Sequence, residues 1–238
     1  MYQKDYDVEE NLKSVERSEY DDTLYVLNHF IKEFNIKDGL VLDLGSGDCH
    51  YHKYLKSTVL GIDKKESKEV YDNLIQDIEV FPYDLQNEDP FNFVFSIDVF
   101  EHLERPDKVL EYLMQDDHVL NKGGYVFISV PNINTLDDKL NNVNQAIYNP
   151  NLKGLTRGRW NSTHLRFFDI ESLIRMSESF GYKIKAVTGS NFHTSGMFLQ
   201  LAEQMQQLNN TNGLDFCNAL RNTEFSLFAP NICILIQK

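Results

Sequence analysis

The chain has 238 residues, of which 42% are hydrophobic, and its formal net charge is −13. A chain of this size can bury a sizeable core as one α/β unit, so we expect a single domain over residues 1–238. The negative charge would repel a phosphate backbone and argues against a nucleic-acid partner.

The cysteines and the hydropathy pattern bear on where the protein works. The three cysteines are scattered, which fits reduced thiols better than a disulfide framework. No stretch reaches the ~18 continuous apolar residues of a membrane span, and the first residues lack the apolar part of an export sequence. We therefore expect a cytoplasmic protein without a membrane partner.

Apolar residues recur every three or four positions over residues 20–34. This spacing predicts an amphipathic helix within an N-terminal helical cover over residues 1–36. Two interpretations are open. The helix covers one edge of a sheet, or it closes over a bound cofactor together with the tyrosines before it.

An apolar run over residues 40–44 leads directly into the sequence Gly45-Ser46-Gly47. This pattern predicts a buried parallel strand and a tight turn, where glycines let the backbone approach a ligand closely, and a short helix over residues 51–55. A second apolar run, over residues 59–62, ends in Asp63. An acidic residue near this offset binds ribose hydroxyls in dinucleotide-type folds, although Asp63 could instead cap a helix.

The next segment, residues 64–77, is charged, and we expect a reduced helix there. Apolar residues then predict a third strand over residues 78–81, which Pro82 ends. Asp84 follows this strand, whereas Asp77 precedes it. Asp84 is therefore the preferred candidate for a ligand contact, with an ordinary turn aspartate as the alternative.

The fourth predicted strand covers residues 91–97, and Asp98, Phe100 and His102 follow its carboxyl end. Ligands bind at this end of the strands in open parallel sheets. Phe100 could equally be a core residue. His102 is either a general base, because imidazole titrates near pH ~6.5, or a structural histidine that fixes the turn by bonding Glu101 or the backbone.

A helix is predicted to begin at Pro106. A turn is predicted over residues 121–124, and a fifth strand over residues 125–130. Residues 132–163 then form an irregular insertion, which we interpret as a cover over the substrate. His164 follows it and is the second candidate base. Arg166 could bind an acidic substrate group or form a surface ion pair.

The remaining elements complete the predicted sheet. Asp169 is expected to cap a helix over residues 170–180 that Gly181 ends, and a sixth strand follows over residues 182–187. Residues 197–208 are predicted to be another helix. The last apolar run, residues 232–236, is predicted to be a buried strand.

Taken together, these motifs resemble those of a known family. In chain order they are Asp43-x-Gly45-x-Gly47, Asp63, Tyr83-Asp84-Leu85, residues 97–103, Gly123-Gly124 and Val130-Pro131-Asn132. The series resembles that of class I S-adenosylmethionine-dependent methyltransferases, and most closely the small-molecule branch that includes the ubiquinone-biosynthesis O-methyltransferases. The resemblance covers roughly residues 38–190.

The resemblance implies a fold and a cofactor. The fold is α/β, a doubly wound and mostly parallel sheet of seven strands, with the last strand antiparallel beside the fifth. The cofactor is S-adenosylmethionine. The residues that the resemblance places around it are Asp43, Gly45, Ser46, Gly47, Asp63, Asp84, Leu85, Asp98 and Phe100.

The resemblance also assigns roles to these residues. The glycine turn and Asp43 would meet the aminoacyl end of the cofactor, Asp63 its ribose, and Asp84 with the Leu85 amide its adenine. The chain departs from the family pattern at Cys49, where a third glycine often stands. Ser46 also differs, because cysteine is common at its position.

The reaction that the resemblance implies is an in-line displacement at carbon with the sulfonium as leaving group. The protein would align the acceptor, exclude water and remove a proton through His102 or His164. A small-molecule oxygen acceptor is our first prediction, and we predict no metal. The alternatives are a cofactor-binding protein without turnover and a nicotinamide-dependent oxidoreductase. The missing last glycine of G-x-G-x-x-G argues against the oxidoreductase.

Overall fold

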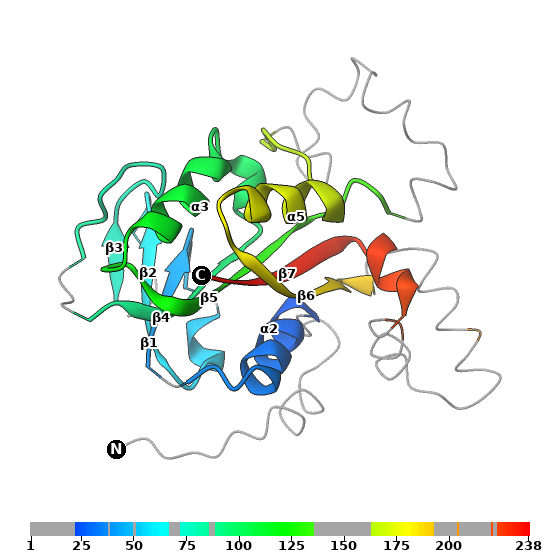
Figure 1. Ribbon diagram of the computed structural model, residues 1–238, viewed down its shortest axis with the longest axis horizontal. Helices are drawn as coiled ribbons and strands as arrows, with labels where there is room; N and C mark the ends of the chain where they lie inside the picture. The colour runs from blue at the N-terminus through cyan, green and yellow to red at the C-terminus, as the bar shows by residue number, and fades with distance from the viewer. Residues whose placement is uncertain are drawn as a thin grey trace.

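Seven strands form one sheet in the computed structural model of the protein (Figure 1). The structure describes residues 22–37, 39–49, 51–66, 72–85, 89–135, 163–192, 204, 220 and 223–238. The strands are β1 Leu40–Leu44, β2 Thr58–Asp63, β3 Asn73–Ile75, β4 Phe91–Ile97, β5 Leu120–Pro131, β6 Lys183–Ser190 and β7 Asn231–Gln237.

The strand order is β3-β2-β1-β4-β5-β7-β6. The pairs on the β3 side of β5 are parallel, and β7 lies antiparallel between β5 and β6. This arrangement confirms the predicted fold class, including the antiparallel last strand beside the fifth.

The carboxyl ends of β1, β2 and β4 lie at one edge of the sheet. Asp43 of β1 is opposite Gly61 of β2 on one side and Phe95 of β4 on the other. The turn after β1 is fixed to its neighbour because the Gly45 amide donates to the Ile62 carbonyl at 2.8 Å. The residues that follow these strands therefore meet where ligands bind in open parallel sheets.

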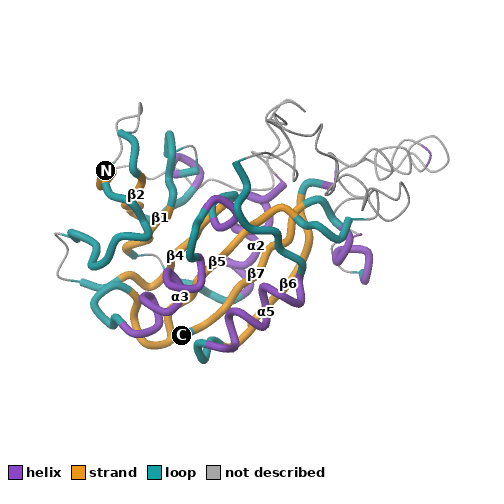
Figure 2. The backbone as a smooth tube through the Cα atoms, turned by 90° about the horizontal axis from the view of Figure 1, so that it is seen from above, coloured by secondary structure: helices purple, strands orange, loops and turns teal. Residues whose placement is uncertain are grey.

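Helices cover both faces of the sheet (Figure 1). On one face lies α2, Asp22–Glu33, where Phe30 packs edge-on against Phe127 of β5. On the other face lie α3, Pro106–Gln115, and α5, Ile170–Ser179, as Figure 2 shows from that side. Burial of each large apolar side chain contributes ~1.5–3 kcal/mol. Cover on both faces explains why the central strands are apolar almost throughout.

The position of α2 confirms the helix predicted over residues 20–34. Its Thr23 hydroxyl lies 3.0 Å from the Ser190 hydroxyl of β6, and its apolar face is buried in the core. These contacts support the interpretation of α2 as a cover of the sheet. The tyrosines that were expected to close over a cofactor lie outside the described residues.

The structure corrects the third strand. The strand is Asn73–Ile75, and residues 78–82 form turns and bends. The predicted helix over residues 64–77 is therefore wrong where β3 lies, and residues 67–71 are outside the described part. The apolar run misled the prediction because it forms turns and bends, in which Ile78 is buried and Val80 is 57% exposed. The Tyr83 hydroxyl donates to the Ile78 carbonyl at 2.8 Å, and both residues are buried.

The predicted turn over residues 121–124 is also wrong, because these residues belong to β5. The pairing of β4 with β5 shifts register between Phe91 and Phe93. Gly123 has φ +79°, a conformation that suits glycine at an irregularity within a strand. The glycine pair therefore marks an irregularity in β5.

The elements at the end of the described chain agree with prediction. Asp169 caps α5, since its carboxylate accepts from the Ser172 amide at 2.8 Å and the Ser172 hydroxyl accepts from the Asp169 amide. Gly181 follows with φ +93°. A short 3₁₀ helix, Glu224–Phe228, precedes β7. The helix predicted over residues 197–208 and most of the insertion lie outside the described residues.

Among the described residues, no helix is long and apolar enough to cross a bilayer. The Lys238 side chain is 5% exposed and packs against the C-terminal end of α3. Its Nζ donates to the carbonyls of Leu113, Asp116 and Leu120 at 2.9 to 3.0 Å and lies 3.0 Å from Asp117 Oδ1. Carbonyls at a helix C-terminus lack partners within the helix, so a cation there stabilises it.

Lys238→Met should lower the free energy of unfolding by about 2–3 kcal/mol, because three carbonyls lose a charged donor. Lys122→Met is the matched control: Lys122 pairs with the same Asp117 at 3.2 Å, but its side chain is 85% exposed. Exposed pairs contribute little, so we expect no measurable change there. Urea denaturation measures both, and equal effects of the two substitutions would contradict this assignment.

Candidate functional site

The turn after β1 has three residues in the left-handed region: Gly45 at φ +78°, Gly47 at +51° and Cys49 at +57°. The amides of Gly45 and Ser46 both donate to the Ile62 carbonyl, at 2.8 and 3.1 Å. Cys49 therefore keeps the backbone conformation that a glycine at its position would favour. The departure from the family pattern leaves the shape of the turn intact.

The two glycines of the turn have different surroundings. A Cβ on Gly45 would lie 2.5 Å from Val99 Cγ2, so this position is closed by packing. A Cβ on Gly47 would meet nothing within 4 Å. The space beside Gly47 is therefore open, and a ligand can approach its backbone there.

Asp63 lies directly beside this turn. Its Oδ2 accepts from the Gly47 amide at 3.0 Å, and its Oδ1 accepts from the Lys65 amide at 2.9 Å. Each carboxylate oxygen has two acceptor directions, so these bonds leave capacity for hydroxyl donors. The structure thus brings together the glycine turn and the acidic residue that the sequence placed at one site.

Ser46 holds the turn to the neighbouring strands. Its hydroxyl donates to Asn73 Oδ1 of β3 at 2.9 Å. A Cβ on Gly61 would lie 2.5 Å from Ser46 Oγ, so only glycine leaves room for this contact. Through its side chain, Ser46 fixes the backbone of the turn to β2 and β3.

Asp43 has a partner that sequence reasoning missed. In place of the predicted helix over residues 51–55 the structure has a single 3₁₀ turn, His52–Tyr54. His52 Nε2 lies 3.0 Å from Asp43 Oδ2, and both side chains are buried. Burial raises the pKa of Asp43, while the hydrogen bond and charge of His52 lower it and the charge of Asp63 raises it. An isolated histidine in a polar segment gives no pattern from which this contact could be predicted.

The correction of β3 changes the candidate for the third contact. Because β3 ends at Ile75, Asp77 follows the strand, and the reason for preferring Asp84 no longer holds. Asp77 Oδ1 accepts from the Glu79 amide at 3.0 Å. The Asp84 amide donates to Gln76, and the Leu85 amide donates to the Tyr83 carbonyl.

A 3₁₀ turn, Phe100–His102, follows β4. Asp98 precedes it with φ +55°, and its Oδ1 accepts from Asn231 Nδ2 at 2.7 Å. Left-handed conformations of residues other than glycine cluster at functional sites. Phe100 is fully buried in the core, which favours the core interpretation of this aromatic residue.

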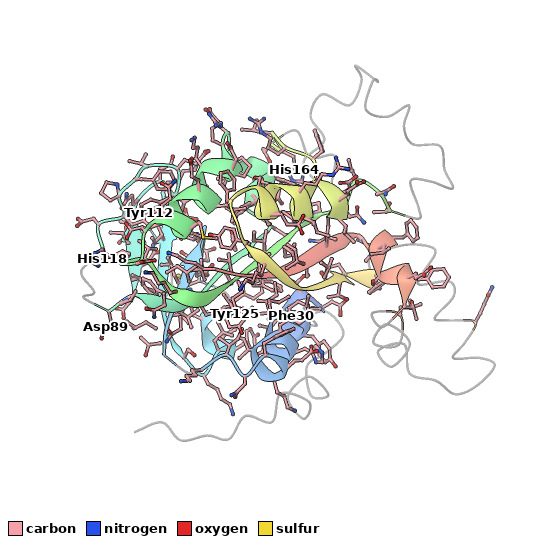
Figure 3. The ribbon with its side chains drawn as sticks, in the orientation of Figure 1. Phe30, Asp89, Tyr112, His118, Tyr125 and His164 are labelled. Carbon is pink, nitrogen blue, oxygen red and sulfur yellow. The ribbon has the colours of Figure 1, made fainter. Side chains whose placement is uncertain are left out.

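The chain brings the two candidate bases together. The ring centroids of His102 and His164 are 4.8 Å apart at an interplanar angle of 83°. The Glu101 carbonyl holds the second segment in place, because it accepts from the amides of Leu165 and Arg166 at 2.7 and 2.9 Å. Figure 3 shows His164 near the start of α5, on the opposite side of the sheet from Phe30.

The protonation of His102 follows from its hydrogen bond. Its Nδ1 lies 3.1 Å from the Thr163 carbonyl, which can only accept, so Nδ1 donates. In the neutral ring Nε2 is then the basic nitrogen. The side chain is 39% exposed, so a substrate can reach it.

Glu101, which the sequence offered as a partner of a structural His102, is a buried carboxyl group beside this pair. Its Oε1 lies 3.9 Å from His102 Nε2, and its Oε2 has no hydrogen-bond partner among the described residues. Burial, followed by the charge of Asp98, raises the pKa of Glu101 to about 8. Ligand atoms of Glu101, His102 and His164 lie within 4.8 Å of one another, so this group could hold a metal ion. The sequence showed no such set because His164 is distant along the chain.

The guanidinium of Arg166 contacts two backbone carbonyls. Its Nη1 donates to the Leu165 carbonyl at 2.9 Å, and its Nη2 donates to the Glu104 carbonyl. The guanidinium therefore fixes the segment after His164 against the turn that follows His102.

The fold and the site define an α/β protein whose parallel strands present a glycine turn and an acidic residue for a nucleotide-like cofactor. A family profile described as a methyltransferase domain matches residues 19–187. The chain therefore belongs to this family of methyltransferase domains. Comparison with curated proteins finds no match.

Solved structures with the same fold include several methyltransferases. A SAM-dependent methyltransferase from Archaeoglobus fulgidus is 17% identical over 90% of this chain and 94% of its own, with a TM-score of 0.50. A possible histamine N-methyltransferase from Thermotoga maritima is 13% identical over 90% and 95%, with a TM-score of 0.53. The cyclopropane synthase MmaA2 from Mycobacterium tuberculosis is 12% identical over 91% and 84%, with a TM-score of 0.53. These similarities show the fold.

The protein is a methyltransferase, and the predicted class and its cofactor, S-adenosylmethionine, are confirmed. The described residues fit this cofactor, because open space lies beside Gly47 and Asp63 lies next to it. The family match identifies neither the ubiquinone-biosynthesis branch nor a particular acceptor.

Gly47→Ala should lower the affinity for S-adenosylhomocysteine at least about ten-fold, because the new Cβ fills the space beside the turn. The left-handed backbone also costs about 1–2 kcal/mol. Gly181→Ala is the matched control, since Gly181 has φ +93°, meets nothing within 4 Å and follows α5. It should cost similar stability and leave the affinity unchanged in isothermal titration calorimetry. Equal affinities in the two variants would place the ligand away from Gly47.

Proposed function

We propose that this protein transfers the methyl group of S-adenosylmethionine to a hydroxyl group of a small molecule, with His102 as the general base. The proposal rests on the contact between the rings of His102 and His164. His102 lies in the 3₁₀ turn that follows the carboxyl end of β4. An imidazole there takes a hydroxyl proton at neutral pH. The related structures have different acceptors in their descriptions and favour none of them.

The cofactor would be held by the turns after β1, β2 and β3. We propose the amides and open face of the glycine turn for its aminoacyl end, with Asp43 near the ammonium group. We propose Asp63 for its ribose and Asp77, in place of Asp84, for its adenine. Bound S-adenosylmethionine supplies an electrophilic methyl group on a sulfonium.

The acceptor would bind beside the histidine pair. We propose that the insertion over residues 132–163 covers it, because both ends of the insertion reach this site. Asn132 forms a bridge with Phe168, and the Ile133 amide donates to the Phe168 carbonyl at 3.0 Å. His102 contacts the Thr163 carbonyl at the other end.

We infer different roles for the two histidines. His102 Nε2 carries the lone pair that takes the proton, since Nδ1 is committed to a carbonyl. His164 packs edge-on against the His102 ring and supports its orientation. The protein would work in the cytoplasm as a single domain without a membrane partner.

The adenine contact can be assigned with two substitutions. Asp77→Ala should weaken S-adenosylhomocysteine binding about ten-fold, since a hydrogen bond to a charged group is lost. Asp84→Ala should leave it unchanged. S-inosylhomocysteine, which lacks the adenine amino group, should bind the Asp77→Ala variant as well as S-adenosylhomocysteine does. A loss confined to Asp84→Ala would restore the original assignment.

The acceptor and the base can be tested together. Hydroxyl, amine and carbon acceptors are screened with methyl-labelled S-adenosylmethionine, and we expect transfer to a hydroxyl compound. On that acceptor His102→Ala should lower kcat about 100-fold. His164→Ala should lower it less, and the exposed His118→Ala should not change it. Figure 3 shows His118 far from His164.

A chelator separates proton transfer from metal binding in the same assay. If His102 is a base, EDTA leaves the rate unchanged. A rate that falls with EDTA and returns with a divalent cation would make Glu101, His102 and His164 metal ligands instead. Full activity in both alanine variants would exclude a histidine base. Cofactor binding without transfer to any acceptor would favour a binding protein.

A further inference from the structure

Asp43 and His52 form a contact that the family motifs do not include. Asp43 is the next-to-last residue of β1, and His52 lies in the 3₁₀ turn that follows the glycine turn. The His52 amide also donates to the Cys49 carbonyl at 3.1 Å. His52 thus reaches back across the turn to the strand that precedes it.

The pair is buried, which makes its charge state important. An unpaired carboxylate at a buried position is strongly disfavoured, and such a group takes up a proton instead. Asp43 also lies near the negative charge of Asp63, which opposes its ionisation further. His52, at 3.0 Å, is the group at this position that favours the ionised form.

An ionised Asp43 matters for one part of the cofactor only. The aminoacyl tail carries an ammonium group, and the nucleoside carries no charge. A carboxylate at the end of β1 attracts the ammonium, whereas a protonated carboxyl group does so much less. Loss of His52 should therefore affect the tail and leave the nucleoside site, around Asp63, intact.

We propose that His52 is a positioning residue for the aminoacyl end of S-adenosylmethionine, and that it acts by keeping the Asp43 carboxylate ionised and fixed beside the glycine turn. This inference rests on the proposed role of Asp43 at the ammonium group. It predicts that His52 discriminates between ligands with and without the tail.

The test compares two probes by isothermal titration calorimetry. S-adenosylhomocysteine has the aminoacyl tail, and 5′-methylthioadenosine has the same nucleoside thioether without it. His52→Gln, which replaces the imidazole by an uncharged amide, should lower the affinity for S-adenosylhomocysteine about ten-fold. The affinity for 5′-methylthioadenosine should change less than about two-fold, because its contacts lie outside the pair.

Matched variants separate this role from a general structural one. Asp43→Asn should reproduce the effect of His52→Gln, and the double variant should be no weaker than either single one, because both remove one interaction. His29→Gln is the matched control, because His29 also lies beside a carboxylate, that of Glu33, at 3.2 Å on the exposed side of α2. This substitution should change neither affinity.

Three outcomes would overturn the proposal. These are an equal loss for both probes, no loss for either, or additive effects of Asp43→Asn and His52→Gln. The wild-type protein gives a further readout, since the His52 ring resonances should shift with S-adenosylhomocysteine and much less with 5′-methylthioadenosine. Equal shifts would contradict the proposal. If the wild-type protein binds neither probe, the proposed function itself fails.

Discussion

The hydrogen bonds that tie the turn after β1 to β2 are the constraint on which the site depends. The Ile62 carbonyl accepts two amides of the turn, and Asp63, at the end of the same strand, accepts a third from Gly47. The turn cannot move without breaking these bonds. The glycine amides and the carboxylate of Asp63 are therefore presented to a ligand at a fixed separation, before any cofactor binds.

A second long-range contact builds the part of the site that we propose for the acceptor. The Glu101 carbonyl pairs with amides of residues that lie far along the chain, and this pairing brings His164 against His102. The contact also places the buried Glu101 carboxyl group beside both rings. The half of the site proposed for catalysis is thus made by tertiary packing, whereas the half proposed for the cofactor is made by neighbouring strands and the turns after them.

This difference explains how much the sequence could predict. Strands with continuous apolar character, such as Leu40–Leu44 and Phe91–Ile97, were predicted with the observed bounds because burial on both faces leaves a strong pattern. The edge strand Asn73–Ile75 was missed, because a strand of three residues with little burial has no apolar pattern that a sequence could show. The neighbouring apolar run looked like a strand although it forms turns and bends, and the preference for Asp84 was based on that error.

The partner His52 could not have been predicted, since its importance comes from its burial against Asp43. Glu101 could be named as a partner of His102, but its burial could not be predicted. The central claim is that the glycine turn and Asp63 hold the methyl donor. A crystal structure with S-adenosylhomocysteine tests it most directly. We expect the aminoacyl group beside Gly47 and both ribose hydroxyls within hydrogen-bond distance of Asp63. A nucleoside bound elsewhere, or an Asp63 carboxylate without contact to the ribose, would contradict the account.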